Sequence, residues 1–443
     1  MADFPIVPVH KFLRSAFKIL KNPLPFHKKN FREKGDTFLL KLGFGKSVVF
    51  SRNAAFAQYV LQKNQKNYTK SPIQTQDLAK YVGKGLLTAE GQHWATQRKL
   101  IQPAFHKKHL AQLIAKMQEV IETELDKIKT DQPFDVFPVY NDLAFQTVVQ
   151  ALFSGAADQK VINRLQQITE EAQAMLVKEL RQPYLGWWFK ISGKLQDNIQ
   201  KTREARKLLE QLVEERQALG VRQDDLLDML LDARYEDDTA MSKDQLVDEI
   251  FILFVAGHET TSNALTFITQ LLGLHPEVQQ RVYEEAKACE HEDLGLQLRS
   301  LTYTNLVINE SMRLYPPAYF IDRIALQEDS FDNYRIKAGT SLLFSIYEIH
   351  RHPDFWEEPE KFNPLRFEDE RLLKYSPYFL PFGAGPRMCI GNNLAMYEMI
   401  LAVAALVKRY EIISDGRPIE IKPLITLKPQ NASLTFRNRK LEH

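Results

Sequence analysis

The sequence predicts a mainly α-helical domain with small β-sheets, and three observations support this fold class. Helical periodicity of apolar residues dominates nearly all of the chain after residue 51. The stretch 38–51 has β-branched and apolar runs on either side of Gly43-Phe44-Gly45, which is typical of a β-hairpin. No internal repeat, long low-complexity linker or change of composition marks a second domain. We therefore expect residues 1–443 to form one domain, with 441–443 (Leu-Glu-His) as the remnant of an expression tag.

Composition excludes several classes of function. Hydrophobic residues make up 44% of the chain, which is enough for a large core. The 58 basic residues nearly balance the 56 acidic ones, so the charge gives no reason to expect a nucleic-acid partner. The two cysteines argue against a disulfide framework and suit a reducing cytoplasm. Cys289 lies in a charged run, and we expect it on the surface of a helix.

The N-terminal 30 residues contain no candidate membrane span. Charged residues interrupt every apolar run well before the roughly 20 residues that cross a bilayer, and no apolar signal core with a small-residue cleavage site is present. We expect a cytoplasmic protein. Apolar and basic residues alternate between Lys11 and Lys21, so weak association with a membrane surface stays open.

The first chemical feature lies between Gly83 and His106. Trp94 and Arg98 are four residues apart and share one helical face. An indole N–H and a guanidinium on one face can bind a pair of carboxylates. A half-buried tryptophan beside a solvated arginine is the alternative, and the two residues taken alone favour it.

Two amphipathic helices are predicted between Val161 and Gly220. Proline, glycine and four aromatic residues in Gln182–Phe189 break the helical pattern between them. The aromatic residues either line a mobile entrance to a pocket or form a packed apolar turn, and both interpretations remain open.

A long helix is predicted to begin after Ser242 and to end near Gly273. Ser242 and Gln245 have the spacing of a capping box, and the helix would be roughly 45 Å long. Residues 250–257 are apolar on every face, so we expect burial on all sides. Ala256-Gly257-His258-Glu259-Thr260-Thr261 then places a glycine, an acid and hydroxyls in the middle of this helix, against local helix preference.

The most specific motif is Phe382-Gly383-Ala384-Gly385-Pro386-Arg387-Met388-Cys389-Ile390-Gly391. Its glycines and proline indicate a tight, irregular backbone. In such a loop backbone N–H groups can turn toward the sulfur of Cys389, and Arg387 adds positive charge nearby. A thiolate in this setting is a plausible metal ligand.

This loop is similar, position for position, to the haem-binding loop of the cytochrome P-450 family, Phe-x-x-Gly-x-Arg-x-Cys-x-Gly. The chain contains four other motifs of this family, and all five occur in the order that the family has. The resemblance covers essentially all of the chain from about Phe38 onward. The resemblance implies the cytochrome P-450 fold, with the long central helix over a buried haem b (iron protoporphyrin IX). Because we expect no N-terminal anchor, the chain resembles the soluble bacterial members of the family.

The resemblance also implies roles for individual residues. Cys389 would be the iron ligand, and Thr260 and Glu259 would relay protons during oxygen activation. The residues expected to contact haem are Trp94, Arg98, Ala256, Gly257, Arg323, Phe382, Arg387, Cys389 and Gly391. Those expected to contact substrate are Ala318, Tyr319, Phe320 and Ile425. Glu310, Arg313 and Arg366 would form a structural network, although Leu365 stands where the family often has glutamate.

The implied function is a haem-thiolate monooxygenase that inserts one oxygen atom from O2 into a C–H bond, by hydroxylation or oxidative O-demethylation. We expect a monomer whose electrons come from a ferredoxin and its reductase, since no Gly-x-Gly-x-x-Gly loop is present. A peroxide-using haem-thiolate enzyme, a non-catalytic haem sensor and a haem-free helical scaffold are the alternatives. The substrate, a fatty acid, a terpenoid or a methylated sugar, stays open.

Overall fold

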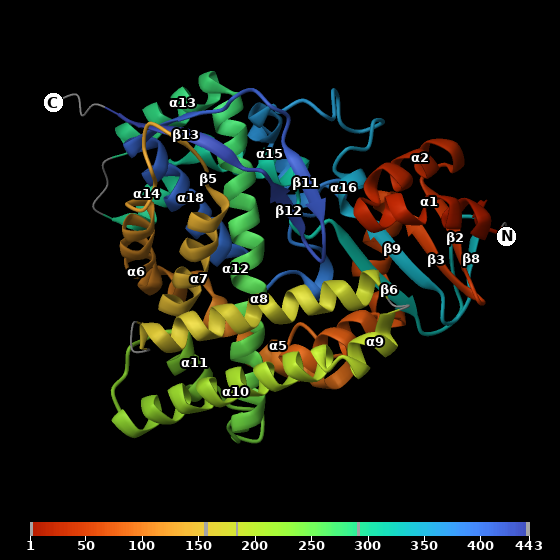
Figure 1. The fold of residues 1–443 in the computed structure, drawn as a ribbon, viewed down its shortest axis with the longest axis horizontal. Helices are drawn as coiled ribbons and strands as arrows, with labels where there is room; N and C mark the ends of the chain where they lie inside the picture. The colour runs from red at the N-terminus through yellow and green to blue at the C-terminus, as the bar shows by residue number, and fades with distance from the viewer. Residues whose placement is uncertain (1–2, 155–157, 183–184, 290–292, 440–443) are drawn as a thin grey trace.

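One helix organises the molecule. In the computed structural model, which describes residues 3–154, 158–182, 185–289 and 293–439, α12 (Lys243–Leu274) runs through the middle of the helical part (Figure 1). Its 32 residues correspond to about 48 Å. The Ser242 hydroxyl caps its N-terminus by accepting a hydrogen bond from the Gln245 N–H at 3.2 Å. The predicted helix is therefore confirmed, but the Gln245 side chain bonds Lys84 and Glu249 instead of completing the capping box.

Helices from both halves of the chain pack around α12. Its closest neighbour is α7, and α18, α15, α13 and α10 also contact it. The helices before α12 are α1 (Val9–Lys21), α2 (Leu24–Lys34), α3 (Ala54–Gln58), α4 (Ala79–Val82), α5 (Gly91–Ile101), α6 (Lys107–Leu125), α7 (Phe137–Phe153), α8 (Gln159–Arg181), α9 (Gly186–Ile191), α10 (Lys194–Leu219) and α11 (Leu226–Asp232). Those after it are α13 (Pro276–Ala288), α14 (Leu294–Ser300), α15 (Thr302–Leu314), α16 (Ile346–Ile349), α17 (Glu370–Tyr375) and α18 (Asn392–Arg409).

The largest β-sheet lies to one side of the helices, whereas the strands β5, β11, β12 and β13 lie among them (Figure 1). The largest sheet has the order β1-β2-β3-β9-β6-β4 and contains the predicted hairpin, with β2 antiparallel to β3. Its strands are β1 (Ile6–Val7), β2 (Thr37–Gly43), β3 (Lys46–Ser51), β4 (Tyr68–Thr69), β6 (Phe320–Ala325) and β9 (Ser341–Ser345). The smaller sheets comprise β5 (Pro133–Asp135), β7 (Asp329–Phe331), β8 (Tyr334–Ile336), β10 (Tyr410–Ile413), β11 (Glu420–Pro423), β12 (Leu427–Gln430) and β13 (Ser433–Asn438).

Two local expectations from the sequence, for Cys289 and for residues 250–257, were wrong, and a short helix occupies part of the segment 182–189, whose role the sequence left open. The break between α8 and α10 contains the short helix α9, in which Phe189 is buried while Trp187 and Trp188 are exposed; residues 183–184 lie outside the described residues. Cys289 is buried, because it follows α13 and packs into the core beside α14. Ala256 is exposed and Leu253 and Gly257 are half-buried, so other parts of the protein do not cover the apolar run 250–257 on all sides.

The N-terminal helix α1 has no buried residue, and its Leu13 and Phe17 side chains are exposed. Within the described part of the chain, no helix combines the length and the apolar character needed to cross a membrane.

Candidate functional site

The cysteine loop connects the sheet side of the molecule to the start of α18. The Cys389 N–H donates to the Phe382 carbonyl at 2.9 Å, which closes the loop on itself. Phe382 and Gly391 are both half-buried at its two ends. The loop therefore presents one cysteine from a fixed backbone directly before a helix of the core.

Gly385 is required by the shape of this loop. Its φ is +72°, and a Cβ atom there would stand 1.9 Å from the Leu61 carbonyl oxygen. Both the left-handed backbone and the contact exclude a larger residue. The sequence motif is thus explained by the close approach of the loop to the backbone of residues 59–63.

The Cys389 side chain is accessible to a water molecule, although protein atoms surround the thiol on most sides. Burial raises the pKa of this thiol, and the Gly391 N–H and the Arg98 guanidinium act in the opposite direction. A cationic metal bound to the sulfur would favour the thiolate much more strongly.

Helix α5 places Trp94 and Arg98 beside the loop. Arg98 donates through Nη1 to the Met388 carbonyl at 2.8 Å, and the Arg387 guanidinium lies 4.1 Å from the centre of the Trp94 ring. Arg387 also forms an ion pair with Glu90 at 2.6 Å. The sequence correctly put Trp94 and Arg98 on one helix, and the structure adds that both contact the cysteine loop.

Sequence reasoning missed Lys70 and Glu90. Lys70 is buried, and its pKa is lowered to about 7 by burial, with Arg387 and Arg323 nearby and Glu90 and Asp322 acting against them. Burial likewise lowers the pKa of Arg323, to about 10. An isolated lysine in Tyr-Thr-Lys-Ser carries no motif, so only the fold reveals this cluster.

The cationic cluster, defined as Lys70, Arg98, Arg323 and Arg387, has more positive charge than its acidic neighbours Glu90 and Asp322 can balance. Buried cations that exceed their partners are costly unless an anion joins them. The cluster is therefore suited to a ligand with two carboxylates.

The middle of α12 presents small and hydroxylated residues. Ala256 is exposed, and Gly257 and Thr260 are half-buried. The Thr260 hydroxyl donates back to the Ala256 carbonyl at 2.9 Å. A Cβ on Gly257 would approach a methyl group of Val148 to 2.8 Å, so α7 packs closely here.

Glu259 is held by the C-terminal hairpin. The Thr426 hydroxyl donates to its Oε1 at 3.0 Å and accepts from Nδ2 of Asn263, also at 3.0 Å. His258 is buried, its Nδ1 lies 2.8 Å from the Phe254 carbonyl oxygen, and burial lowers its pKa. The hydrogen bond of Glu259 to a distant part of the chain could not be found from the sequence.

Glu310, Arg313 and Arg366 form a buried network. Arg313 donates to both carboxylate oxygens of Glu310, at 2.6 and 2.8 Å, with both side chains fully buried. Arg366 lies 3.4 Å from the same carboxylate, and the Asn363 N–H donates to it at 2.9 Å. The three residues that the sequence grouped thus meet in the core, where Arg313 also binds three backbone carbonyls.

The four predicted substrate-contacting residues differ in exposure. Ala318 and Ile425 are exposed and Phe320 is half-buried. Tyr319 is buried, and its hydroxyl donates to the Leu424 carbonyl at 2.6 Å. Ile425 occupies the tip between β11 and β12, as the sequence predicted for residues 424–427.

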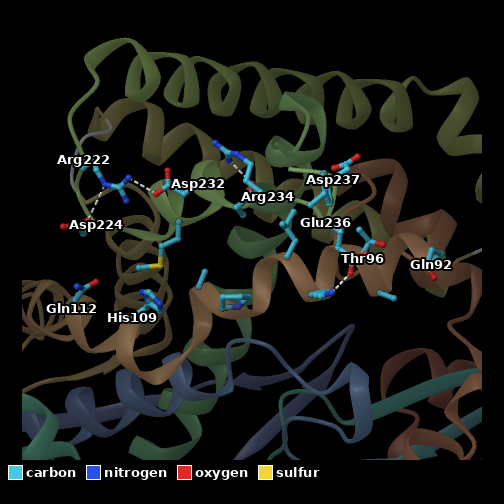
Figure 2. A pocket seen from close by; sticks show the side chains of 18 residues that line it. Gln92, Thr96, His109, Gln112, Arg222, Asp224, Asp232, Arg234, Glu236 and Asp237 are labelled. Atoms are coloured by element: carbon cyan, nitrogen blue, oxygen red, sulfur yellow. Dashed lines mark hydrogen bonds and ion pairs between the residues drawn. The ribbon is translucent and has the colours of Figure 1, made fainter. Parts of the chain in front are cut away.

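Two cavities flank these elements. One, of about 1030 Å³, lies on the face of α5 away from Trp94 and is shown in Figure 2; Thr96, Arg234 and Glu236 line it. The other, of about 760 Å³, lies between α7, α8, α12 and the β11–β12 hairpin and reaches Glu259.

Comparison with known proteins places the chain in a family. The model of the family described as cytochrome P450 matches residues 5–436. Human cytochrome P450 4B1 is 30% identical over 421 residues, which cover 88% of this chain and 81% of that protein. Cyclooctat-9-en-7-ol 5-monooxygenase of Streptomyces melanosporofaciens is 30% identical, with 75% of this chain and 73% of that protein covered.

A solved structure, the haem domain of cytochrome P450DA, has the same fold. It superimposes with a TM-score of 0.88 at 21% identity, over 99% of this chain and 98% of that chain. The mainly helical fold with small sheets predicted from the sequence is therefore confirmed.

The residues present fit the haem that this family carries. An accessible cysteine thiol can bind iron, and the cationic cluster has the surplus charge that two propionates need. The exposed Ala256 leaves one part of α12 without a large side chain. The chain belongs to the cytochrome P450 family and is a haem-thiolate monooxygenase.

Proposed function

We propose that Cys389 holds the haem iron and that the enzyme oxidises an apolar small molecule at a C–H bond. The observation that carries the proposal is the accessible thiol of Cys389 on a closed loop beside the cationic cluster. When bound, haem supplies the oxidising centre for oxygen insertion. The reaction balances as R–H, O2, two electrons and two protons giving R–OH and water. The same insertion at an O-methyl carbon would release formaldehyde.

The cationic cluster and Trp94 would anchor the two propionates. Arg98 and Arg387 are already oriented by the Met388 carbonyl, the Trp94 ring and Glu90. Pre-oriented donors lose little freedom when the ligand arrives. Lys70 is added to the residues expected from the sequence.

Thr260 and Glu259 would provide the two protons of each turnover. Thr260 offers a hydroxyl in the helix turn that also carries the exposed Ala256. Glu259 is a half-buried carboxyl one residue away that can exchange protons with water. Phe382 and Gly391 would contact the haem, whereas the missing side chain of Gly257 makes room for Val148 of α7.

A fatty acid or terpenoid is the substrate class we favour. Ala318, Phe320 and Ile425 present apolar surface, and the Streptomyces relative, by its name, oxidises the alcohol cyclooctat-9-en-7-ol. A methylated sugar would require more polar contacts than these residues offer.

Electrons would come from a ferredoxin and its reductase, and residues 1–443 would act as one monomeric catalytic domain. Basic residues near the cysteine loop suit an acidic ferredoxin. A docking surface of this kind makes reduction slower at high ionic strength, and reduction rates that do not change with salt would contradict it.

Two measurements test the proposed function. Spectral shifts of the haem band on addition of fatty acids, terpenoids and methylated sugars identify the substrate class. Turnover of the best binder is then followed with ferredoxin, reductase and NADPH, and separately with peroxide alone. Hydroxylated product in the first system supports the proposal; product with peroxide alone favours the peroxide-using alternative.

A further inference from the structure

A polar cleft reaches Glu259 from the molecular surface. It is the cavity of about 760 Å³ between α7, α8, α12 and the β11–β12 hairpin, and Figure 1 shows α8 crossing α12 there. His258 and Glu259 belong to its lining, whereas Glu170, Lys178 and Lys422 are exposed lining residues. The cleft thus connects an interior carboxyl to solvent through charged walls, where water is stable.

The polar side chains along the cleft are held in place by hydrogen bonds. Asn141 of α7 donates to Glu170 of α8 at 2.8 Å, and Gln166 donates to Asp142 at 2.9 Å. Lys428 lies 4.3 Å above the ring of Phe137. These contacts keep acceptors and donors for water along both walls.

Thr426 controls the inner end of the cleft. It is buried, and it donates its hydroxyl proton to Glu259 while it accepts from Asn263. Because the Nδ2 group of Asn263 can only donate, the direction of the Thr426 hydroxyl is fixed toward the carboxylate. His258, by contrast, has Nδ1 at 2.8 Å from a backbone carbonyl of its own helix, and burial lowers its pKa, which disfavours a charged imidazole at this end.

The hairpin tip that carries Thr426 is fixed to the segment expected to contact substrate. The Leu427 N–H donates to the Pro317 carbonyl at 2.9 Å, and Tyr319 donates to the Leu424 carbonyl. Residues on either side of Ala318 and Ile425 therefore move with Thr426, which links the position of Glu259 to the substrate side.

We propose that this cleft is the route by which protons from water reach Glu259, with Thr426 as the positioning residue that holds the carboxylate at its inner end. The inference rests on the proposed proton relay through Glu259. In each transfer Glu259 gives its proton toward Thr260 and takes one from water in the cleft, so the carboxyl is restored. Two such transfers match the two protons consumed per oxygen atom reduced to water.

The hydrogen bond is tested by a double-mutant cycle in the haem-loaded protein. Thr426→Val and Glu259→Gln are combined and unfolded in urea, with Thr435→Val on β13 replacing Thr426→Val in the control cycle. We expect a five- to tenfold non-additivity in the unfolding equilibrium for Thr426 with Glu259, and none for Thr435. Additive effects in both cycles would overturn the positioning role.

The route is tested by chemical access. Glu259→Cys, in a Cys289→Ser background, is labelled with a small water-soluble methanethiosulfonate in the haem-loaded protein. Ala174→Phe fills the cleft from α8, and Ala95→Phe fills the cavity of Figure 2 as the matched control. We expect Ala174→Phe to slow labelling at least tenfold and Ala95→Phe to leave it unchanged. Equal labelling in the two variants would show that Glu259 is reached from elsewhere.

Turnover separates this inference from the relay on which it rests. With ferredoxin, reductase and NADPH, the peroxide released per NADPH is measured in both water and deuterium oxide. We expect Thr426→Val and Ala174→Phe to raise the peroxide yield and the solvent isotope effect, and Thr426→Ser to restore both. If Glu259→Gln changes neither quantity, the relay itself is wrong; if only Glu259→Gln changes them, the relay stands and the cleft is not its route.

Discussion

Replacing Glu310 by glutamine should destabilise the protein far more than the same change at the surface. Glu310→Gln keeps the shape of the side chain but removes the charge that faces Arg313 and Arg366. Arg313 is fully buried and Arg366 nearly so, with side-chain exposures of 0% and 11%. Breaking one partner of a buried ion pair costs about 3–5 kcal/mol, because the remaining charge stays buried without compensation.

A matched control is the exposed pair of Glu328 and Arg335. Arg335 also donates twice to its partner, at 2.8 Å each, but both side chains are about half exposed. Such exposed pairs contribute little to stability because solvent screens them, so Glu328→Gln should change stability little. Urea unfolding followed by circular dichroism measures both variants under identical conditions. Equal losses for Glu310→Gln and Glu328→Gln would refute the buried-network account.

Three further predictions concern other parts of the molecule. Burial raises the pKa of Glu249 to about 7. Between pH 4.5 and 7 the native state therefore keeps a proton that the unfolded chain has lost. The free energy of unfolding should fall by about 3 kcal/mol over this range. In urea unfolding at pH 5 and pH 8, Glu249→Gln should lack this loss; identical pH profiles of the two proteins would contradict it. Gly385→Ala should cost at least about 2 kcal/mol more than Gly416→Ala, since both have positive φ but a Cβ has no neighbour at Gly416; equal melting shifts would rule out the clash. Thr260→Ala should retain haem while diverting electrons to peroxide, and unchanged coupling of NADPH to product would count against its role in proton delivery.

Local sequence signals predicted the elements that depend on neighbouring residues. The hairpin of 38–51, the capped helix after Ser242 and the helix that follows Gly391 all agree with the structure. Each of these elements depends on a local signal, namely apolar periodicity, a helix cap or the position of glycines, and the residues that carry the signal lie close together in the sequence. The cysteine loop was found for the same reason, since its shape depends on glycines inside the motif.

Contacts between distant segments could not be predicted in this way. Lys70 meets Arg323 and Arg387 only because β4 pairs with β6 and the loop packs beside them. Thr426 reaches Glu259 across 167 positions of the chain. Cys289 seemed exposed because its sequence neighbours are charged, yet its burial is decided by α14 packing next to it. Ala256 was expected to be buried because its neighbours in sequence are apolar, yet its side chain is exposed.

The measurement that tests the central claim most directly is the absorption spectrum of the reduced, haem-loaded protein treated with carbon monoxide. Ligation by the Cys389 thiolate predicts the red-shifted thiolate band in the unchanged protein and in Cys289→Ala, and its loss in Cys389→Ala. A folded, haem-loaded protein that lacks this band, or a Cys389→Ala variant that keeps it, would contradict the assignment of Cys389 as the iron ligand.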